Sequence, residues 1–161
     1  MTAAADPVVR PMRWWDVERL LPLEDRLFGH EAWSAPTWWS ELAQCEQRDY
    51  VVLQGATDGD VDGYAGVSVA AGVADLMTVA VSPDRQGQGL GRFLVQQLVT
   101  LARARGAGRM MLEVRADNVA AQRVYSSVGF ERIAVRRGYY RTPQGPADAW
   151  VMQLRIASTG E

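Results

Sequence analysis

Residues 79–92 read VAVSPDRQGQGLGR, and the expected fold is built outward from this segment. Residues 76–81 are an alternating apolar stretch, which predicts a strand. After the segment, leucines recur at helical spacing at Leu90, Leu94, Leu98 and Leu101. Gly106 predicts the end of that helix. A turn with three glycines therefore joins a strand to a helix N-terminus, where free N–H groups and the helix dipole favour an anion, most often a phosphate.

Two common phosphate-binding motifs do not fit this turn. The P-loop requires a lysine, and the chain contains none. The dinucleotide pattern G-x-G-x-x-G nearly fits from Gly87, with Glu113 as its distant acid, but its last position is Arg92. Three consecutive predicted strands also precede the turn, whereas a dinucleotide-binding fold alternates strand and helix from its start. A solvent-exposed glycine turn without a ligand remains an alternative.

The pattern Gln/Arg-x-x-Gly-x-Gly does fit, at residues 86–91. It resembles the pyrophosphate-binding turn of the GCN5-related N-acetyltransferases (GNAT), which hold acetyl-coenzyme A. Residues 112–118, followed by Ala121, Tyr125 and Gly129-Phe130, resemble the segment that closes the cofactor cleft of this family. The cofactor-binding residues that the resemblance implies are Val79, Ala80, Val81, Gln86, Gly87, Gln88, Gly89, Leu90, Gly91, Arg92 and Asn118.

Length and composition bound the protein class. The chain has 161 residues, with 48% apolar and 22% charged residues, as expected of a single globular domain. Its single cysteine, Cys45, excludes a disulfide framework, and its single histidine, His30, makes a metal site unexpected. No signal-peptide pattern and no apolar run of about 18 residues is present. We therefore expect a cytoplasmic protein that binds no metal or membrane.

Charge is distributed unevenly along the chain. Residues 1–80 contain 5 arginines and 13 acidic residues, whereas residues 81–161 contain 12 arginines and 6 acidic residues. A basic C-terminal half suits a polyanionic cofactor, and an acidic N-terminal half suits a cationic substrate. The alternative is that these charges are spread over solvated faces. Since all basic residues are arginines, no lysine is available as a catalyst.

The expected fold class is α+β, a single GNAT domain with a mixed, mostly antiparallel sheet of about seven strands flanked by four helices, in the order β-α-α-β-β-β-α-β-α-β-β. We expect the domain to cover 8–156, with disordered segments 1–7 and 157–161. Expected strands are Val8–Trp14, Tyr50–Gln54, Val61–Ala70, 72–81, Arg109–Arg115, Phe130–Arg137 and Ala149–Ile156. We expect four helices: one capped by Asp16, one covering Thr37–Glu46, one starting at Leu90, and one covering Asn118–Val128. Asp58-Gly59-Asp60 is an expected turn, and Tyr139–Asp148 is an expected loop.

Asn118 and Tyr125 are seven residues apart, which is about two helical turns, so they share one helix face. A purely structural alternative makes Asn118 a helix cap and Tyr125 a core aromatic.

Beyond the turn, the chain resembles the RimI type of this family, bacterial enzymes that acetylate the N-terminal alanine of a small-subunit ribosomal protein. The resemblance covers nearly the whole chain, including Ala32-Trp33-Ser34, Leu112–Arg115 and Arg136–Tyr140, although Ala32 stands where the family often has proline.

The resemblance implies direct transfer in a ternary complex, with Glu113 as base and Tyr125 as acid. It also implies that Trp33, Tyr139 and Tyr140 bind the substrate, the N-terminal peptide of a ribosomal protein. An α-amine has a pKa of about 7.7–8.0, so roughly 10–15% is neutral at pH 7 and a carboxylate suffices as base. Tyr125 is protonated at that pH, since the reference pKa of a phenol is about 10.

Several alternatives to this assignment remain open at the level of sequence. Glu113 could be a structural carboxylate paired with Arg115 or Arg109. The chain could acetylate a small-molecule amine, or bind acyl-CoA without catalysis, although a binder needs neither Glu113 nor Tyr125. We expect no direct nucleic acid binding, and a monomer is favoured over an oligomer.

Overall fold

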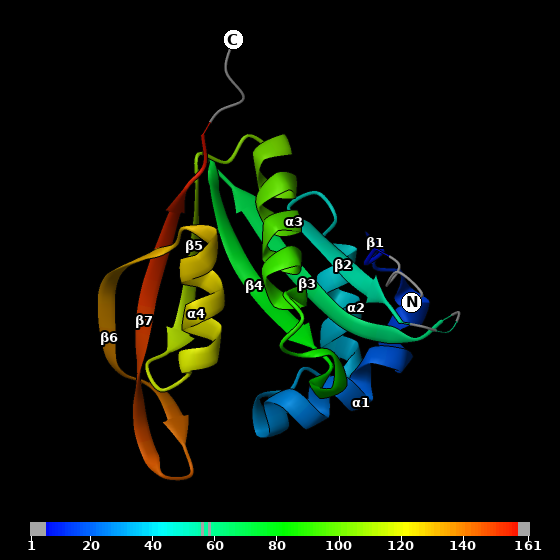
Figure 1. The fold of residues 1–161 in the computed structure, drawn as a ribbon, viewed down its shortest axis with the longest axis horizontal. Coiled ribbons are helices and arrows are strands. Elements are labelled where there is room, and N and C mark those ends of the chain that lie inside the picture. The colour runs from blue at the N-terminus through cyan, green and yellow to red at the C-terminus, as the bar shows by residue number, and fades with distance from the viewer. Residues whose placement is uncertain (1–5, 56, 58, 158–161) are drawn as a thin grey trace. The chain divides into compact units, whose positions relative to one another are not determined.

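A computed structural model of the chain describes residues 6–55, 57 and 59–157 (Figure 1). The strands in these residues are β1 (Val9–Pro11), β2 (Arg48–Gln54), β3 (Val61–Ala70), β4 (Val73–Val81), β5 (Arg109–Arg115), β6 (Glu131–Thr142) and β7 (Gly145–Arg155). The α-helices are α1 (Val17–Phe28), α2 (Ala35–Ala43), α3 (Leu90–Ala104) and α4 (Val119–Val128), with short 3-10 helices η1 (Trp14–Asp16), η2 (Gly29–Glu31) and η3 (Pro83–Arg85). The element order and the α+β class agree with the sequence prediction.

The strands form one mixed sheet in the order β1-β2-β3-β4-β5-β7-β6. β1 pairs antiparallel with β2, and β7 pairs antiparallel with both β5 and β6. β4 pairs parallel with β5, with Val73 opposite Arg109 and Asp75 opposite Met111. None of the helices in the described residues is long and apolar enough to cross a membrane.

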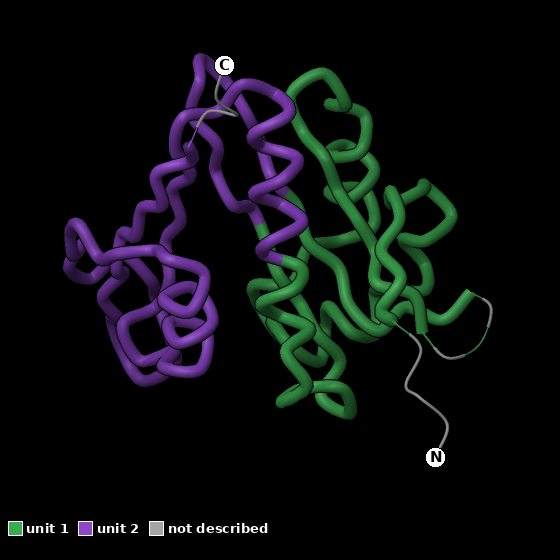
Figure 2. Tube along the Cα trace, turned by 45° about the horizontal axis from the view of Figure 1, so that its top comes forward, with its two compact units in different colours: residues 1–66, 78–94 green, residues 67–77, 95–161 purple. Residues whose placement is uncertain are grey.

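The chain divides into two compact units, shown in Figure 2. Unit 1 contains the residues up to Gly66 together with Thr78–Leu94, and unit 2 contains Val67–Met77 and the chain from Val95 onward. The largest fully buried side chains of unit 1 are Trp38, Tyr64, Leu20, Leu53 and Leu94, and those of unit 2 are Leu98, Met110 and Met152. Each unit therefore has its own apolar core.

Strand β5 shows how a local pattern positions functional residues. Met110, Leu112 and Val114 are buried, while Arg109 and Glu113 alternate with them and are exposed. This alternation with a period of two residues follows from strand geometry, since successive side chains point to opposite faces. Glu113 therefore lies on the outward face of β5.

The predicted first strand, Val8–Trp14, is wrong at its C-terminal end. β1 ends at Pro11, and residues 14–16 form η1. The cause is Asp16, which is fully buried and accepts hydrogen bonds from the Arg10 guanidinium at 2.7 Å and from the Arg13 backbone N–H at 2.7 Å. Burial acts to raise the pKa of Asp16, but these hydrogen bonds hold it below its usual value. The Asp16 side chain makes no capping hydrogen bond to α1, contrary to the prediction.

The predicted loop Tyr139–Asp148 is also wrong, because most of it belongs to the β6–β7 hairpin. β6 continues to Thr142 and β7 begins at Gly145, which leaves two residues between them. The register shifts between Arg136 and Tyr140, so this stretch of β6 contains a bulge. Gly138 lies in the bulge with a φ of +63°, and its N–H donates to Asp148 Oδ1 at 2.9 Å. The bulge therefore contains a glycine in a backbone conformation that other residues rarely adopt.

Helix boundaries shift only slightly from the prediction. α2 begins at Ala35 with Ser34 as its cap and ends at Ala43 rather than Glu46. α4 ends at Val128 and is followed by Gly129, whose φ of +116° caps the helix as expected. Asp58, in the predicted turn 58–60, and most of the predicted terminal segments 1–7 and 157–161 lie outside the described residues.

Gly66 on β3 has no space for a side chain. A Cβ at this position would lie 2.1 Å from Cε1 of Tyr50, whose ring is buried and whose hydroxyl donates to Glu41 at 2.7 Å. We expect Gly66→Ala to lower the free energy of unfolding by about 1–3 kcal/mol, because the buried ring must move. Gly108→Ala is the matched control, since a Cβ there meets nothing within 4 Å. Urea unfolding of both variants measures the difference, and equal stabilities would contradict the proposed clash.

Candidate active site

The glycine-rich turn lies in unit 1, between η3 and α3. Gly87 and Gly89 both have a φ of +78°, a conformation that side chains other than glycine adopt rarely. The first intrahelical hydrogen bond of α3 runs from the Phe93 N–H to the Gly89 carbonyl at 3.0 Å. The N–H groups of the first turn, residues 90–92, therefore have no acceptor within the helix. They are available to an anion at the positive end of the α3 dipole.

The start of the turn is braced by β3 and by its own side chains. Asp62 on β3 accepts a hydrogen bond from the Ser82 N–H through its carbonyl at 2.7 Å and forms an ion pair with Arg85 through its carboxylate. Arg85 Nε also donates to Gln88 at 3.3 Å, and the Gln86 side chain donates to the Val81 carbonyl at 3.1 Å. These contacts hold the end of β4 and the turn in a fixed conformation before α3 begins.

The environment of the turn fits a pyrophosphate. A Cβ built on Gly87 or Gly89 meets nothing within 4 Å, so the space in front of the backbone is open to a ligand. Ala80 and Leu90 are buried, so their part in binding is limited to the backbone. The other predicted cofactor-binding residues of unit 1, all at least partly exposed, are Val79, Val81, Gln86, Gly87, Gln88, Gly89, Gly91 and Arg92.

The predicted base, Glu113, lies in unit 2 and forms an ion pair. Its Oε1 accepts from Arg136 Nη1 on β6 at 2.7 Å, with the Glu113 side chain 32% exposed and that of Arg136 51% exposed. The Arg136 guanidinium also stacks over the ring of Tyr139, 3.9 Å from its centroid. Glu113 and Tyr139 are therefore joined through Arg136. The hydrogen bond with Glu113 is the largest cause of the raised pKa of Arg136.

The two arginines considered from sequence as partners of Glu113 have other contacts. Arg115 makes two hydrogen bonds to Asp117, at 3.0 and 2.7 Å, and Arg109 lies 3.5 Å from the Gln153 side chain. Arg136 is the ion-pair partner that the sequence argument missed. Its pairing depends on the bulged register of β6 on β7, which no local pattern reveals.

Asp75 on β4 is a second carboxylate near this cluster. Burial raises its pKa, and the negative charge of Glu113 raises it further. No local pattern selects Asp75, because its position beside Glu113 results from the parallel pairing of β4 with β5. Two carboxylates and one guanidinium thus share the outward face of unit 2.

The predicted acid, Tyr125, lies on α4. Its ring makes an edge contact with Phe130, at 5.9 Å between centroids. Burial raises the pKa of Tyr125 to about 12, and the neighbouring Tyr140 phenol contributes in the same direction. The Tyr125 hydroxyl therefore stays protonated throughout the physiological pH range. Tyr140 in turn packs on Tyr139 at 5.1 Å, which brings three of the predicted site tyrosines into one neighbourhood.

Asn118 serves as the N-cap of α4. Its Oδ1 accepts from the Ala121 N–H at 3.2 Å, as the structural alternative predicted. Gln122, also on α4, is buried and donates to the carbonyls of Arg115 and Ala116 at 3.1 and 2.9 Å. These bonds fix the start of α4 to the end of β5. A cofactor contact by Asn118 stays a prediction.

Trp33, predicted on the substrate side, lies in unit 1 before α2. Its ring packs against Trp38 at 4.9 Å and against Tyr50 at 6.4 Å. The ring is neither fully buried nor fully exposed. Trp33 thus forms the outer member of an aromatic cluster whose inner member, Trp38, is completely buried.

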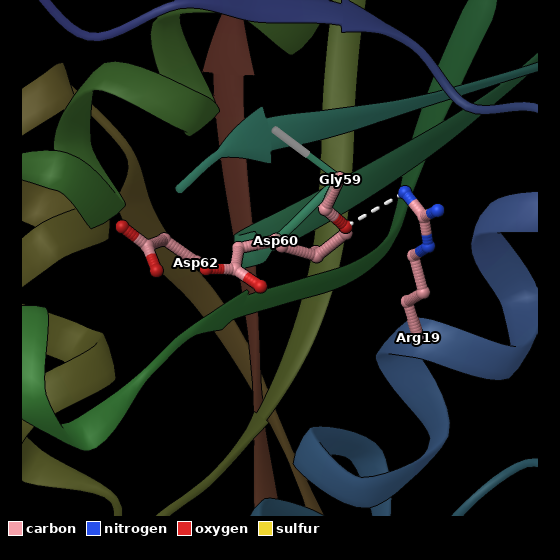
Figure 3. A pocket seen from close by; sticks show the side chains of 5 residues that line it. Arg19, Gly59, Asp60 and Asp62 are labelled. Atoms are coloured by element: carbon pink, nitrogen blue, oxygen red, sulfur yellow. Dashed lines mark hydrogen bonds between the residues drawn. The ribbon is translucent and has the colours of Figure 1, made fainter. Parts of the chain in front are cut away.

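Unit 1 also carries a depression of about 490 Å³ lined by Arg19, Gly59, Asp60, Val61 and Asp62 (Figure 3). Arg19 Nη1 donates to the Gly59 carbonyl at 2.9 Å, and the Asp62 side chain extends away from Arg19 toward its own partner, Arg85. This depression contains none of the predicted site residues. No cluster of three metal-ligating side chains occurs among residues 6–55, 57 and 59–157.

Comparison with known proteins identifies the class. The sequence model of the acetyltransferase (GNAT) family matches residues 13–130. The chain belongs to this family. It is therefore an N-acetyltransferase, and acetyl-CoA is its acetyl donor.

Individual relatives point to one branch of the family. The chain is 40% identical over 121 residues to the [Ribosomal protein bS18]-alanine N-acetyltransferase of Escherichia coli strain K12, covering 74% of this chain and 82% of the relative. It is 38% identical over 159 residues to the N-alpha-acetyltransferase RimI of Mycobacterium tuberculosis, covering 95% and 96%. The crystal structure of the ribosomal-protein-S18-alanine N-acetyltransferase from Escherichia coli matches with a TM-score of 0.83 at 35% identity, covering 96% of this chain and 97% of that chain.

Replacing Gly89 by valine tests the anion-binding role of the turn. We expect Gly89→Val to weaken acetyl-CoA binding by about tenfold or more, because a side chain in the left-handed region distorts the turn and blocks approach to its N–H groups. Gly106→Val is the matched control, since Gly106 has a φ of +83° and equally open space but lies at the C-terminal end of α3. Calorimetry measures both affinities. An unchanged Kd for a folded Gly89→Val protein contradicts the assignment.

Proposed function

We propose that this chain is an N-α-acetyltransferase that transfers the acetyl group of acetyl-CoA to the N-terminal amine, with alanine first, of a small-subunit ribosomal protein. The observation that carries the proposal is the open N-terminus of α3, where two glycines with a φ of +78° leave the backbone accessible. The substrate class is supported by the names of the relatives at 38–40% identity.

The glycine-rich turn holds the pyrophosphate of the donor. The N–H groups of residues 90–92 supply hydrogen bonds, and the α3 dipole supplies positive potential. The guanidinium of Arg92, on the exposed side of the first helical turn, adds a positive charge for the phosphates. Asn118 is a further residue that we propose contacts acetyl-CoA.

Glu113 acts as the general base, directly or through a water. The amine nitrogen forms a bond to the acetyl carbonyl carbon, the carbon–sulfur bond breaks, and the proton of the amine passes to the Glu113 carboxylate. The α-amine makes this step undemanding, because roughly 10–15% of it is neutral at pH 7. Arg136, which bonds to Glu113 Oε1 and stacks on Tyr139, orients the carboxylate for this transfer.

Tyr125 acts as the acid for the departing sulfur. Its pKa of about 12 keeps the phenol protonated and able to donate a hydrogen bond. Since a free thiol has a pKa of about 8.5, a thiolate is a weaker base than this phenolate. The Tyr125 phenol therefore first stabilises the thiolate by a hydrogen bond. It then gives its proton to the sulfur, CoA leaves as a thiol, and the phenolate takes a proton from water. Trp33, Tyr139 and Tyr140 contact the peptide beside the reacting amine.

Glu113→Gln tests the assignment of the base. We expect a loss of about 100-fold or more in kcat at pH 7, because glutamine hydrogen-bonds but cannot accept the proton. Raising the pH toward and above the α-amine pKa of about 7.7–8.0 should restore part of the rate. The measurement is a pH–rate profile of wild type and variant on an alanine-initiated peptide.

Melting temperatures and a control variant complete this experiment. Glu131→Gln is the control: it removes an exposed carboxylate from β6 and should change neither the pH–rate profile nor the melting temperature. A purely structural Glu113 predicts a lower melting temperature and parallel pH–rate profiles for wild type and Glu113→Gln. Parallel profiles would therefore remove Glu113 as base while leaving acetyl transfer itself in place.

Tyr125→Phe tests the assignment of the acid. The ring keeps its contact with Phe130, so we expect the acetyl-CoA Kd to change little while kcat falls by about 100-fold. Tyr50→Phe is the matched control, because Tyr50 is a buried tyrosine whose hydroxyl bonds to Glu41. A Tyr125→Phe enzyme with wild-type turnover would return this residue to a packing role.

A further inference from the structure

A buried carboxylate outside the proposed catalytic groups holds the loop that carries Trp33. Glu24 on α1 is only 3% exposed. Its Oε1 accepts from the Trp33 backbone N–H at 3.0 Å, and its Oε2 accepts from the Tyr64 hydroxyl. Glu24 therefore connects α1, the loop 32–34 and β3 within unit 1. Nothing in the proposed acetyl transfer uses this side chain chemically.

The loop 32–34 is fixed at three separate points. The Trp33 ring packs on Trp38 and Tyr50, and the Ser34 hydroxyl accepts from the Thr37 N–H at 3.3 Å to cap α2. These two contacts tie the loop to the aromatic cluster and to α2. The bond from Glu24 is the contact that fixes the backbone of Trp33 itself relative to α1.

Packing alone does not explain a carboxylate at this position. Burial raises the pKa of Glu24, which shows that the charged form loses solvation there. Burial also raises the pKa of Tyr64, and the Glu24 charge raises it further, so Tyr64 donates and Glu24 accepts. An apolar side chain of similar size would fill the space without a desolvation cost. What the carboxylate adds is a directed acceptor for the Trp33 N–H.

We propose that Glu24 is a positioning residue for the peptide substrate, which holds the loop 32–34 so that Trp33 meets the N-terminal residues of the peptide. This inference rests on the proposed function, in which Trp33 lies on the substrate side. Without the hydrogen bond to Glu24, the loop 32–34 samples several conformations. Peptide binding must then also order this loop, which lowers the net binding free energy. Loss of the anchor therefore weakens peptide binding and leaves donor binding unchanged.

Two variants isolate the bond between Glu24 and Trp33. Tyr64→Phe removes the phenol hydrogen bond and keeps the Trp33 anchor. The double variant Glu24→Met/Tyr64→Phe removes both, and its two apolar side chains leave no buried carboxylate or hydroxyl in the pair. Glu24→Gln is the conservative variant, because its amide oxygen can accept from the Trp33 N–H while its amide nitrogen donates to the Tyr64 oxygen.

The measurements are kcat and KM for an alanine-initiated peptide, the acetyl-CoA Kd and the melting temperature of each protein. We expect the peptide KM of the double variant to be about tenfold higher than that of Tyr64→Phe. A change of this size is expected from the loss of one hydrogen bond together with the order of the loop. The acetyl-CoA Kd should stay within about twofold. Glu24→Gln should return the peptide KM to near the wild-type value.

The possible failures are distinguishable. A folded double variant with the peptide KM of Tyr64→Phe overturns the positioning role while acetyl transfer by the wild type still supports the proposed function. Equal weakening of peptide and acetyl-CoA binding, with a lowered melting temperature, shows a general structural role and also overturns it. A wild-type protein that transfers no acetyl group to the peptide overturns the proposed function first, and the inference that rests on it as well.

Discussion

The backbone conformation of Gly87 and Gly89 is the constraint on which the proposed site depends. Both residues hold a φ of +78°, and this conformation joins the end of β4 to a helix whose first N–H groups have no acceptor within it. Asp62 braces the start of the turn twice, through its carbonyl and through its ion pair with Arg85. These contacts fix the start of the turn, and the turn leads into a helix N-terminus whose N–H groups favour an anion.

Carboxylates in this chain differ in role because their surroundings differ. Asp16 and Glu24 are almost fully buried, and each accepts from one backbone N–H and from one further side chain, so they hold the chain in place. Glu113 is partly exposed and has a single guanidinium partner on one oxygen. In the proposed reaction this openness matters, since a base must reach a proton that arrives from solvent with the substrate. The same side-chain chemistry thus serves both architecture and catalysis.

Much of the fold follows from local pattern. β3 and β5 were predicted at their observed bounds. Along β5, buried side chains alternate with more exposed ones from Met110 to Val114. The strand–turn–helix unit around residues 79–92 was predicted because its glycines mark the turn and its leucines mark the helix, and both patterns are local in the sequence. Glu113 was selected from its place in a motif and is outward-facing by alternation in β5. The hairpin of β6 and β7 was under-predicted, since most of the expected loop Tyr139–Asp148 is strand that pairs across a bulge.

The sequence by itself determined the family and the glycine-rich strand–turn–helix unit, and it selected the candidate base and acid, because short motifs encode each of them. Only the tertiary structure decided which groups those residues meet. Arg136 rather than Arg115 or Arg109 is the observed partner of Glu113, because the pairing depends on the bulged register between β6 and β7. The contact of Glu24 with Trp33 likewise joins α1 to a loop nine residues away. Such contacts depend on how distant segments pack, which local spacing does not encode.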